Sequence, residues 1–192
     1  VTILPTSYLA PISWYKALLS APAEVAIEVC ESFPKQTMRN RCVITGTNGL
    51  QTLTVPVVRV ETKQLTRDVR ICYQTKWQHQ HWMALVSAYR HTPYFDYLAD
   101  ELHPFYEQRF DFLVDFNCRL HEQMMRWLQT SVPLQVTDNW LGDTNLDRFF
   151  LAQPLQPYYQ IFADRHGFQQ NLSIIDLITN LGLESKQYLN NA

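Results

Sequence analysis

A run of polar side chains just before a predicted strand is the first place where this sequence could do chemistry. Lys35, Arg39 and Arg41 supply three cations, and arginine forks bind phosphate or carboxylate groups through paired hydrogen bonds. Gln36 and Asn40 in the same run suit hydroxyl or amide groups. The run therefore favours a site for a sugar phosphate or a nucleotide, with the cations on the phosphate and the two amides on the sugar. A solvent-exposed loop has a similar composition, so that alternative stays open.

The distribution of charge favours an anionic small molecule and disfavours a nucleic acid. Sixteen Lys and Arg against eighteen Asp and Glu leave a net charge of −2, whereas binding to a nucleic acid backbone needs a basic surplus. Residues 33–77 carry eight basic and two acidic side chains, and residues 91–125 carry two basic and seven acidic ones. We expect a nucleotide sugar to prefer the first region. The alternative is that the two regions pair with each other or face solvent.

Tyr8 and His79 are the candidate acid or base of such a site, since a histidine titrates near neutral pH. His79 and His81 have a spacing that puts both on one face of a strand but on diverging faces of the helix predicted there. The segment from His121 begins like a zinc-binding helix, but Met125 stands where the second histidine is needed. The sequence therefore predicts no metal site, and it indicates no cofactor.

A second candidate for chemistry is the pair Cys118 and His121, three residues apart on one predicted helix. A thiolate beside an imidazolium is a nucleophile, but both residues lie near the apolar stripe of the helix, which favours packing in the core. The four cysteines, Cys30, Cys42, Cys72 and Cys118, include no close pair for zinc or disulfide exchange. We expect them to be reduced and buried, in a cytoplasmic protein.

The elements that position these residues begin with short strands in the first third of the chain. Residues 25–30 alternate with a period of two, which predicts a strand with one buried face. Two runs, 42–45 and 50–55, flank Gly46-Thr47-Asn48-Gly49 and predict a hairpin, because Asn-Gly tolerates the positive φ of a primed turn. A further short strand is predicted over 69–73.

Helical spacing replaces the period of two from Trp77 onward. Apolar residues three and four apart predict one helix from Trp77 to the Thr92-Pro93 step, since a residue before proline avoids the α region. A second, shorter helix is predicted over 94–102. The most amphipathic helix is predicted over 113–128, and Pro133 closes it.

The two ends of the chain have weaker patterns. The first 23 residues are apolar but interrupted by prolines and Lys16, so we expect folded structure there and not a leader. Residues 153–160, rich in Pro, Gln and Tyr, predict an ordered loop over the core. A short helix is predicted between a cap at Ser173 and Gly182. No run reaches the roughly 18 apolar residues that a membrane helix needs.

Taken together, these patterns predict one α+β domain over residues 1–192. A small, mainly antiparallel sheet from about residues 1–75 packs against helices from about 76–132. The segment of about 133–192 forms an ordered C-terminal extension that wraps the sheet or its neighbouring helices.

Several short motifs, in this order, resemble the WbqC-like proteins of bacteria, and the resemblance covers most of the chain. The motifs are Leu4-Pro5-Thr6-Ser7-Tyr8-Leu9-Ala10-Pro11 with Trp14, Tyr15 and Lys16; Lys35-Gln36; Arg39-Asn40-Arg41; Trp77, Tyr89 and Pro93-Tyr94-Phe95; Tyr159-Gln160; Gly167-Phe168; and Asn171 to Leu177. The sequence departs from the usual pattern in an extra residue between the opening proline and tyrosine, and in a shorter stretch from Lys35 to Asn40.

The family takes its name from a gene of O-antigen assembly, so the resemblance implies a transferase of surface polysaccharide synthesis that acts on an activated sugar. It also adds Asn171 to the candidate substrate-binding residues. The usual glycosyltransferase architectures need two Rossmann-like halves or a divalent-ion motif, so acyl or aminoacyl transfer is at least as plausible as glycosyl transfer. The alternative is a non-catalytic accessory or scaffold protein of the same pathway. We expect either a homodimer or a partner enzyme, and aromatic anchors suit such an interface.

Overall fold

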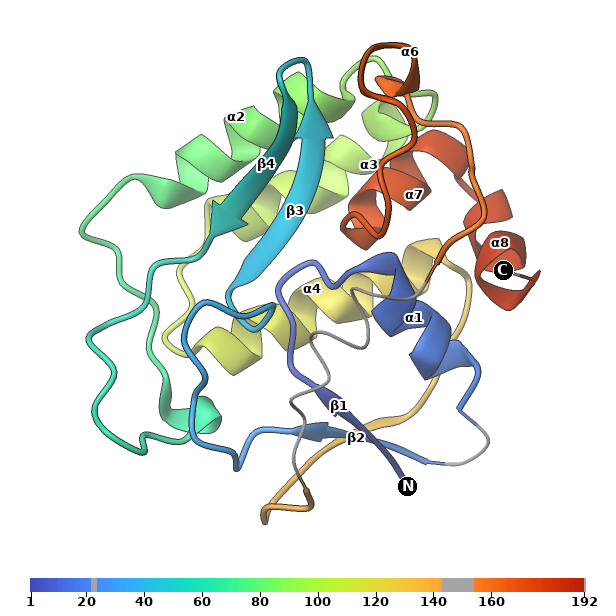
Figure 1. The fold of residues 1–192 in the computed structure, drawn as a ribbon. Helices are drawn as coiled ribbons and strands as arrows, with labels where there is room; N and C mark the ends of the chain where they lie inside the picture. Colours follow the sequence, from blue (N-terminus) through green and yellow to red (C-terminus); the bar gives the residue numbers. More distant parts are fainter. Residues whose placement is uncertain (22–23, 143–153, 192) are drawn as a thin grey trace.

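The computed structural model describes residues 1–21, 24–142 and 154–191, and a parallel sheet lies at the base of the fold (Figure 1). Its strands are β1 (Thr2–Pro5), β2 (Val25–Glu28) and β5 (Leu134–Val136), with β2 in the middle. Val25 pairs with Thr2 on one side and Leu134 on the other. All four residues of β2 are buried because the strand is central and both its faces are covered.

Helix α1 (Ile12–Leu19) connects β1 to β2, as a parallel pair requires a crossover. Pro11 stands at its N-cap with φ −65°, a position where a proline is tolerated because no helical N–H is lost. The sequence analysis expected strands and turns here and missed this helix, because it is short and prolines interrupt the apolar pattern before it.

The predicted hairpin is confirmed as β3 (Arg41–Gly46) and β4 (Gly49–Thr54), a separate two-stranded antiparallel sheet. Cys42 pairs with Leu53, and the register runs to Gly46 opposite Gly49. The positive φ of the turn falls on Gly49, at 98°, and not on Asn48.

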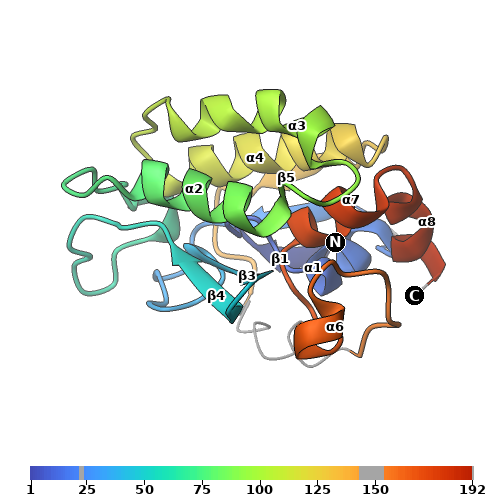
Figure 2. The same cartoon turned by 90° about the horizontal axis from the view of Figure 1, so that it is seen from above.

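Helix α2 (Trp77–Tyr89) packs on β3, and α3 (Phe95–Leu102) and α4 (Leu113–Trp127) lie on the same side of the hairpin. Figure 2 shows them together on one side of β3 and β4. The predictions over the corresponding segments are confirmed to within a few residues. Phe116 and Leu120 of α4 are buried in the core that these layers enclose.

The C-terminal segment contains α6 (Ala163–His166), α7 (Ile174–Leu181) and α8 (Glu184–Asn191). Ser173 caps α7 as predicted, its Oγ accepting a hydrogen bond from the Ile175 N–H at 3.4 Å. Residue 173 also forms a bridge to Pro11, and its N–H donates to the Val43 carbonyl at 2.8 Å. The C-terminal segment therefore ties the start of α1 to the hairpin.

The α+β class and the ordered C-terminal helices are confirmed, with two corrections. The larger sheet is parallel and takes its third strand from residues 134–136, so the expected mainly antiparallel sheet is replaced by a parallel sheet and a separate hairpin. Residues 69–73 form isolated bridges through Arg70 and Ile71 and no strand. Within the described residues, no helix has the length and apolar character needed to span a bilayer.

Candidate functional site

A cavity of about 190 Å³ lies between α1, α4 and the parallel sheet, and we call it the α1–α4 cavity. Its apolar walls come from Ala10, Trp14, Ile27, Leu134 and Val136. Its polar residues come from the turn after β1 and from the inward face of α4. Ligand sites in sheets with parallel strands often lie where strands end and helices begin, and this cavity has that position.

The turn between β1 and α1 is fixed by hydrogen bonds to the loop that precedes β3. The Tyr8 N–H and the Ser7 hydroxyl both donate to the Met38 carbonyl, at 3.0 and 3.1 Å. The Trp14 indole N–H donates to the Pro5 carbonyl at 3.0 Å. These bonds hold the Trp14 ring in the cavity wall.

Asn117 of α4 lines the cavity and is 2 % exposed. Its Nδ2 donates to the Arg39 carbonyl at 2.8 Å and to Thr6 Oγ1 at 3.2 Å. A carbonyl can only accept, so this contact fixes which end of the amide is the donor. Asn117 Oδ1 then has no hydrogen-bond partner among the described residues. A buried acceptor without a partner carries a free-energy cost that a bound ligand would remove.

His121, one turn further along α4, is held by Tyr15 of α1. The Tyr15 hydroxyl lies 3.1 Å from His121 Nδ1, and the two rings stack with centroids 5.4 Å apart. Trp14 meets the imidazole edge-on at 5.3 Å. The aromatic contacts leave the ring one orientation at the cavity wall.

The protonation state of this pair follows from its burial. Burial lowers the pKa of His121 to about 4 and raises the pKa of Tyr15 above its usual value, so both side chains are neutral near pH 7. The Tyr15 hydroxyl has no other acceptor among the described residues, so it donates to Nδ1. The imidazole proton then lies on Nε2, which has no hydrogen-bond partner among the described residues.

Cys118 and Glu122 complete the polar side of the cavity. Burial, with smaller effects from Asp115 and Glu122, raises the pKa of the Cys118 thiol to about 11. With a thiol and a neutral His121 on the same helix, the thiolate–imidazolium pair is not preformed. Glu122 is exposed and accepts a hydrogen bond from Arg119 at 3.1 Å.

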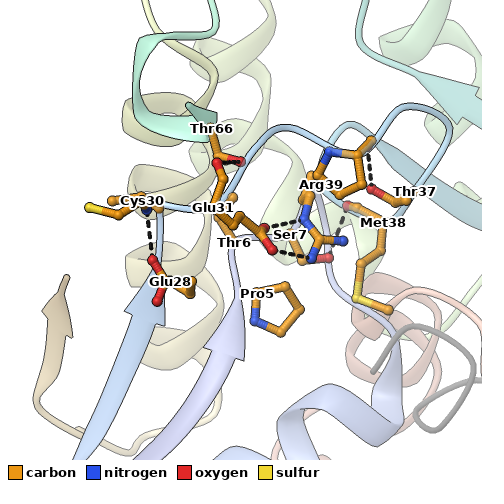
Figure 3. A network of polar contacts seen from close by, with 12 residues as sticks. Pro5, Thr6, Ser7, Glu28, Cys30, Glu31, Thr37, Met38, Arg39 and Thr66 are labelled. Carbon is orange, nitrogen blue, oxygen red and sulfur yellow. Dashed lines mark hydrogen bonds and ion pairs between the residues drawn. The ribbon is translucent and has the colours of Figure 1, made fainter. Parts of the chain in front are cut away.

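Beside the cavity, Arg39 forms a buried ion pair with Glu31. Arg39 Nε lies 2.5 Å from Glu31 Oε1, and Nη2 lies 3.1 Å from Oε2. Figure 3 shows the pair between the segment after β2, which carries Glu31, and the loop that carries Arg39. The guanidinium is fully buried, and its two-pronged contact is the kind expected for a carboxylate or phosphate. Glu31 therefore takes the position that the sequence analysis gave to a ligand.

Comparison with known proteins places this architecture in a family. The model of the WbqC-like protein family matches residues 7–152, which include nearly all of the cavity. The chain belongs to the WbqC-like family. It is also similar to the uncharacterized protein Rv1507c of Mycobacterium tuberculosis, with 28 % identity over 227 residues that cover 98 % of this chain and 96 % of that protein. No solved structure matches.

The substrate-binding residues expected in this WbqC-like chain are distributed over several environments. Lys35 and Gln36 are exposed, and Gln36 has a positive φ of 63°. Asn40 is buried, where its Nδ2 donates to the Val55 carbonyl at 3.0 Å. Arg41 is half-buried at the start of β3. None of these residues, nor Arg39, lines the α1–α4 cavity.

The other predicted site residues are also separated in the structure. Tyr8 is fully buried, and its hydroxyl lies 2.9 Å from both His81 Nδ1 and the Tyr106 hydroxyl. His79 is exposed on α2 whereas His81 is buried, which agrees with the diverging faces that the helical spacing predicted. Asn171 Oδ1 accepts a hydrogen bond from the Ser13 N–H at 2.9 Å and so caps α1.

Sequence reasoning did not identify Asn117, Tyr15 and His121 as one group. One signal was available, since Asn117, Cys118 and His121 place polar atoms on or near the apolar stripe of α4. Polar side chains on an inward face need partners, and Tyr15 from α1 is a partner that spacing along α4 cannot reveal.

Proposed function

We propose that this protein is a transferase that acts on an activated sugar in the synthesis of bacterial surface polysaccharide, with the α1–α4 cavity as the sugar site. The observation that carries the proposal is that one cavity is lined both by Asn117, whose amide oxygen has no partner among the described residues, and by His121, whose imidazole is neutral. Sugars offer hydroxyl groups to such atoms and apolar ring faces to an aromatic wall such as Trp14.

The size of the cavity supports a small bound group. Its volume of about 190 Å³ is below the range of roughly 300–1,000 Å³ typical of drug-sized ligands. One sugar ring or a short acyl group is therefore a better occupant than a whole nucleotide sugar. The carrier portion of the substrate would extend out of the cavity.

The charges of the lining residues support the same division of the substrate. Among the described residues that line the cavity, Glu122 is acidic and none is a Lys or Arg, so a phosphate would lie outside it. The candidate cations for that phosphate are Lys35, on the loop that carries Met38, and Arg41, at the start of β3. Arg39 already has a carboxylate partner.

In the proposed reaction, His121 acts as a hydrogen-bond donor and not as a base. With a pKa of about 4, the imidazole is neutral at physiological pH, and its Nε2–H can polarise a carbonyl or leaving oxygen. A bond forms between the acceptor oxygen or nitrogen and the transferred carbon, and the bond from that carbon to its carrier breaks. The proton of the acceptor passes to water.

The experiment is incubation of the purified protein with nucleotide sugars, alone and with coenzyme A thioesters, followed by mass spectrometry of the products. We expect a mass shift on one sugar, and loss of that shift in His121→Phe. His79→Phe is the matched control, because it removes an exposed histidine from α2 and should leave the reaction unchanged. Absence of any mass shift together with absence of sugar binding by calorimetry would refute the transferase and favour the accessory-protein alternative.

A further inference from the structure

Two hydrogen-bonding atoms among the residues that line the α1–α4 cavity, Asn117 Oδ1 and His121 Nε2, come from one face of one helix. Asn117 and His121 are four residues apart on α4, so their Cβ atoms are about 5–6 Å apart. Asn117 Oδ1 can only accept, and His121 Nε2–H, in the tautomer set by Tyr15, can only donate. These two side chains therefore place one unpaired acceptor and one donor on adjacent turns of α4, beside the cavity.

Most charged groups cannot satisfy both atoms. A carboxylate or phosphate only accepts, so it would leave Asn117 Oδ1 unpaired and would also face the carboxylate of Glu122. An ammonium group only donates, so it would leave His121 Nε2–H unpaired. Each leaves a desolvated polar atom in the complex, which weakens binding.

A secondary amide satisfies both atoms at once. Its N–H donates to Asn117 Oδ1 and its carbonyl accepts from His121 Nε2–H. Its alkyl substituent is apolar and would meet the remaining lining residues, among which Ala10, Ile27 and Val136 are aliphatic. A hydroxyl can also donate and accept, but it brings no apolar group to these walls.

We infer that the α1–α4 cavity recognises the N-acyl group of an acylated amino sugar, through Asn117 Oδ1, His121 Nε2–H and the aliphatic wall. This inference rests on the proposed function, and it names the substrate class of the same site. Asn117 and His121 thus determine specificity, and Tyr15 is the positioning residue that fixes the tautomer.

The test is an NMR titration of the full chain, with ¹⁵N-labelled histidine, against methyl glycosides. The probes are methyl N-acetylglucosaminide and methyl N-acetylgalactosaminide, each compared with the parent methyl glucoside or galactoside and with methyl glucosaminide. We expect the His121 ring signal to move with at least one N-acetyl sugar, at an affinity about tenfold or more above its hydroxyl and amine counterparts.

Two variants at residue 121 separate recognition from folding. His121→Gln keeps an N–H donor near the position of Nε2, and calorimetry should show that most of the N-acetyl preference remains. His121→Phe keeps the aromatic packing but has no donor, and the preference should disappear while the thermal unfolding transition stays cooperative. If the preference survived in His121→Phe and disappeared in His121→Gln, the imidazole would act through packing, and the inference would be overturned.

The remaining outcomes distinguish the inference from the proposed function. Equal affinity for N-acetyl sugars and their hydroxyl counterparts would overturn the inference and leave the proposed transferase standing. If no glycoside binds but N-methylacetamide still moves the His121 signal, amide recognition is supported, and both the sugar assignment and the proposed function are refuted. If neither a glycoside nor N-methylacetamide moves it, the cavity is not an amide site.

Discussion

The hydroxyl of Tyr15 lies 3.1 Å from Nδ1 of His121, across the contact between α1 and α4. This hydrogen bond sets the tautomer of a neutral imidazole and so decides that its free nitrogen is a donor. Two segments that are distant in the sequence thus define one polar atom of the cavity.

Tyr15→Phe removes the hydroxyl and keeps the stacked ring. We expect the unfolding free energy to fall by about 0.5–1.5 kcal/mol. We also expect the imidazole to become a mixture of both tautomers, because nothing then holds the proton on Nε2. Long-range ¹H–¹⁵N correlation spectra of the His121 ring measure this directly. A ring that stays in one tautomer would show that another group sets it.

Arg39→Ala removes the ion-pair partner of the buried Glu31 carboxylate. Breaking a buried ion pair in this way costs about 3–5 kcal/mol, so urea unfolding should show a large loss of stability. Lys35→Ala is the matched control, because this exposed cation should change stability by no more than about 0.5 kcal/mol. A stable Arg39→Ala protein that loses only ligand affinity would restore the role predicted for Arg39 from the sequence.

Asp176 should give the protein a measurable pH dependence of stability. Burial raises its pKa from 3.8 to about 6, although the Tyr158 hydroxyl donates to its Oδ1 at 2.6 Å. Between these pH values the folded chain binds more protons than the unfolded chain, so this contribution to stability decreases as the pH rises from about 4 to 6. The shift corresponds to about 3 kcal/mol.

The comparison with Asp176→Asn isolates this effect. His81 and His121 have pKa values lowered to about 4 by burial, so they act in the opposite direction and reduce stability as the pH falls from 6.5 to about 4. The difference in unfolding free energy between wild type and variant removes their contribution. A difference that stays constant from pH 4 to 7 would mean that Asp176 is ionised throughout.

Asn171 should behave as a helix cap. A glycine at position 171 adopts the local φ of 51° without strain, but Asn171→Gly removes the acceptor for the Ser13 N–H. We expect the unfolding free energy to fall by about 1 kcal/mol. Asn171→Asp keeps an acceptor oxygen and should stay close to the wild type. Chemical denaturation measures both, and sugar affinity should be unchanged in the two proteins. A change in affinity without a change in stability would support the predicted role in substrate binding.

Local patterns were sufficient for the elements whose signals lie within a few residues. The hairpin followed from Gly46-Thr47-Asn48-Gly49 between two apolar runs, and α4 followed from a stripe at spacings of three and four. The cap at Ser173 and the end at Gly182, where φ is 56°, were equally local.

The parallel sheet and the cavity depend on contacts between distant segments. β2 pairs with residues 134–136, and neither amino-acid sequence indicates which strand it pairs with. The run around Arg39 carried the right chemistry for an anion, but the anion is Glu31, eight residues earlier. Asn117 could not be identified for a related reason, since only its contact with the Arg39 carbonyl, on the loop before β3, shows which of its atoms stays unpaired.

The bridge between Ser173 and Pro11 affects the order in which the parts of the protein fold during synthesis. The Ile12 N–H donates to the Leu172 carbonyl and the Ile174 N–H to the Ala10 carbonyl, so the first turn of α1 lacks these partners until residues 171–174 have left the ribosome. Contacts of such long range slow folding, because a large loop must close before they form. A nascent chain should therefore acquire its hairpin and central helices first, and a finished cavity wall only after residues 171–174 have emerged.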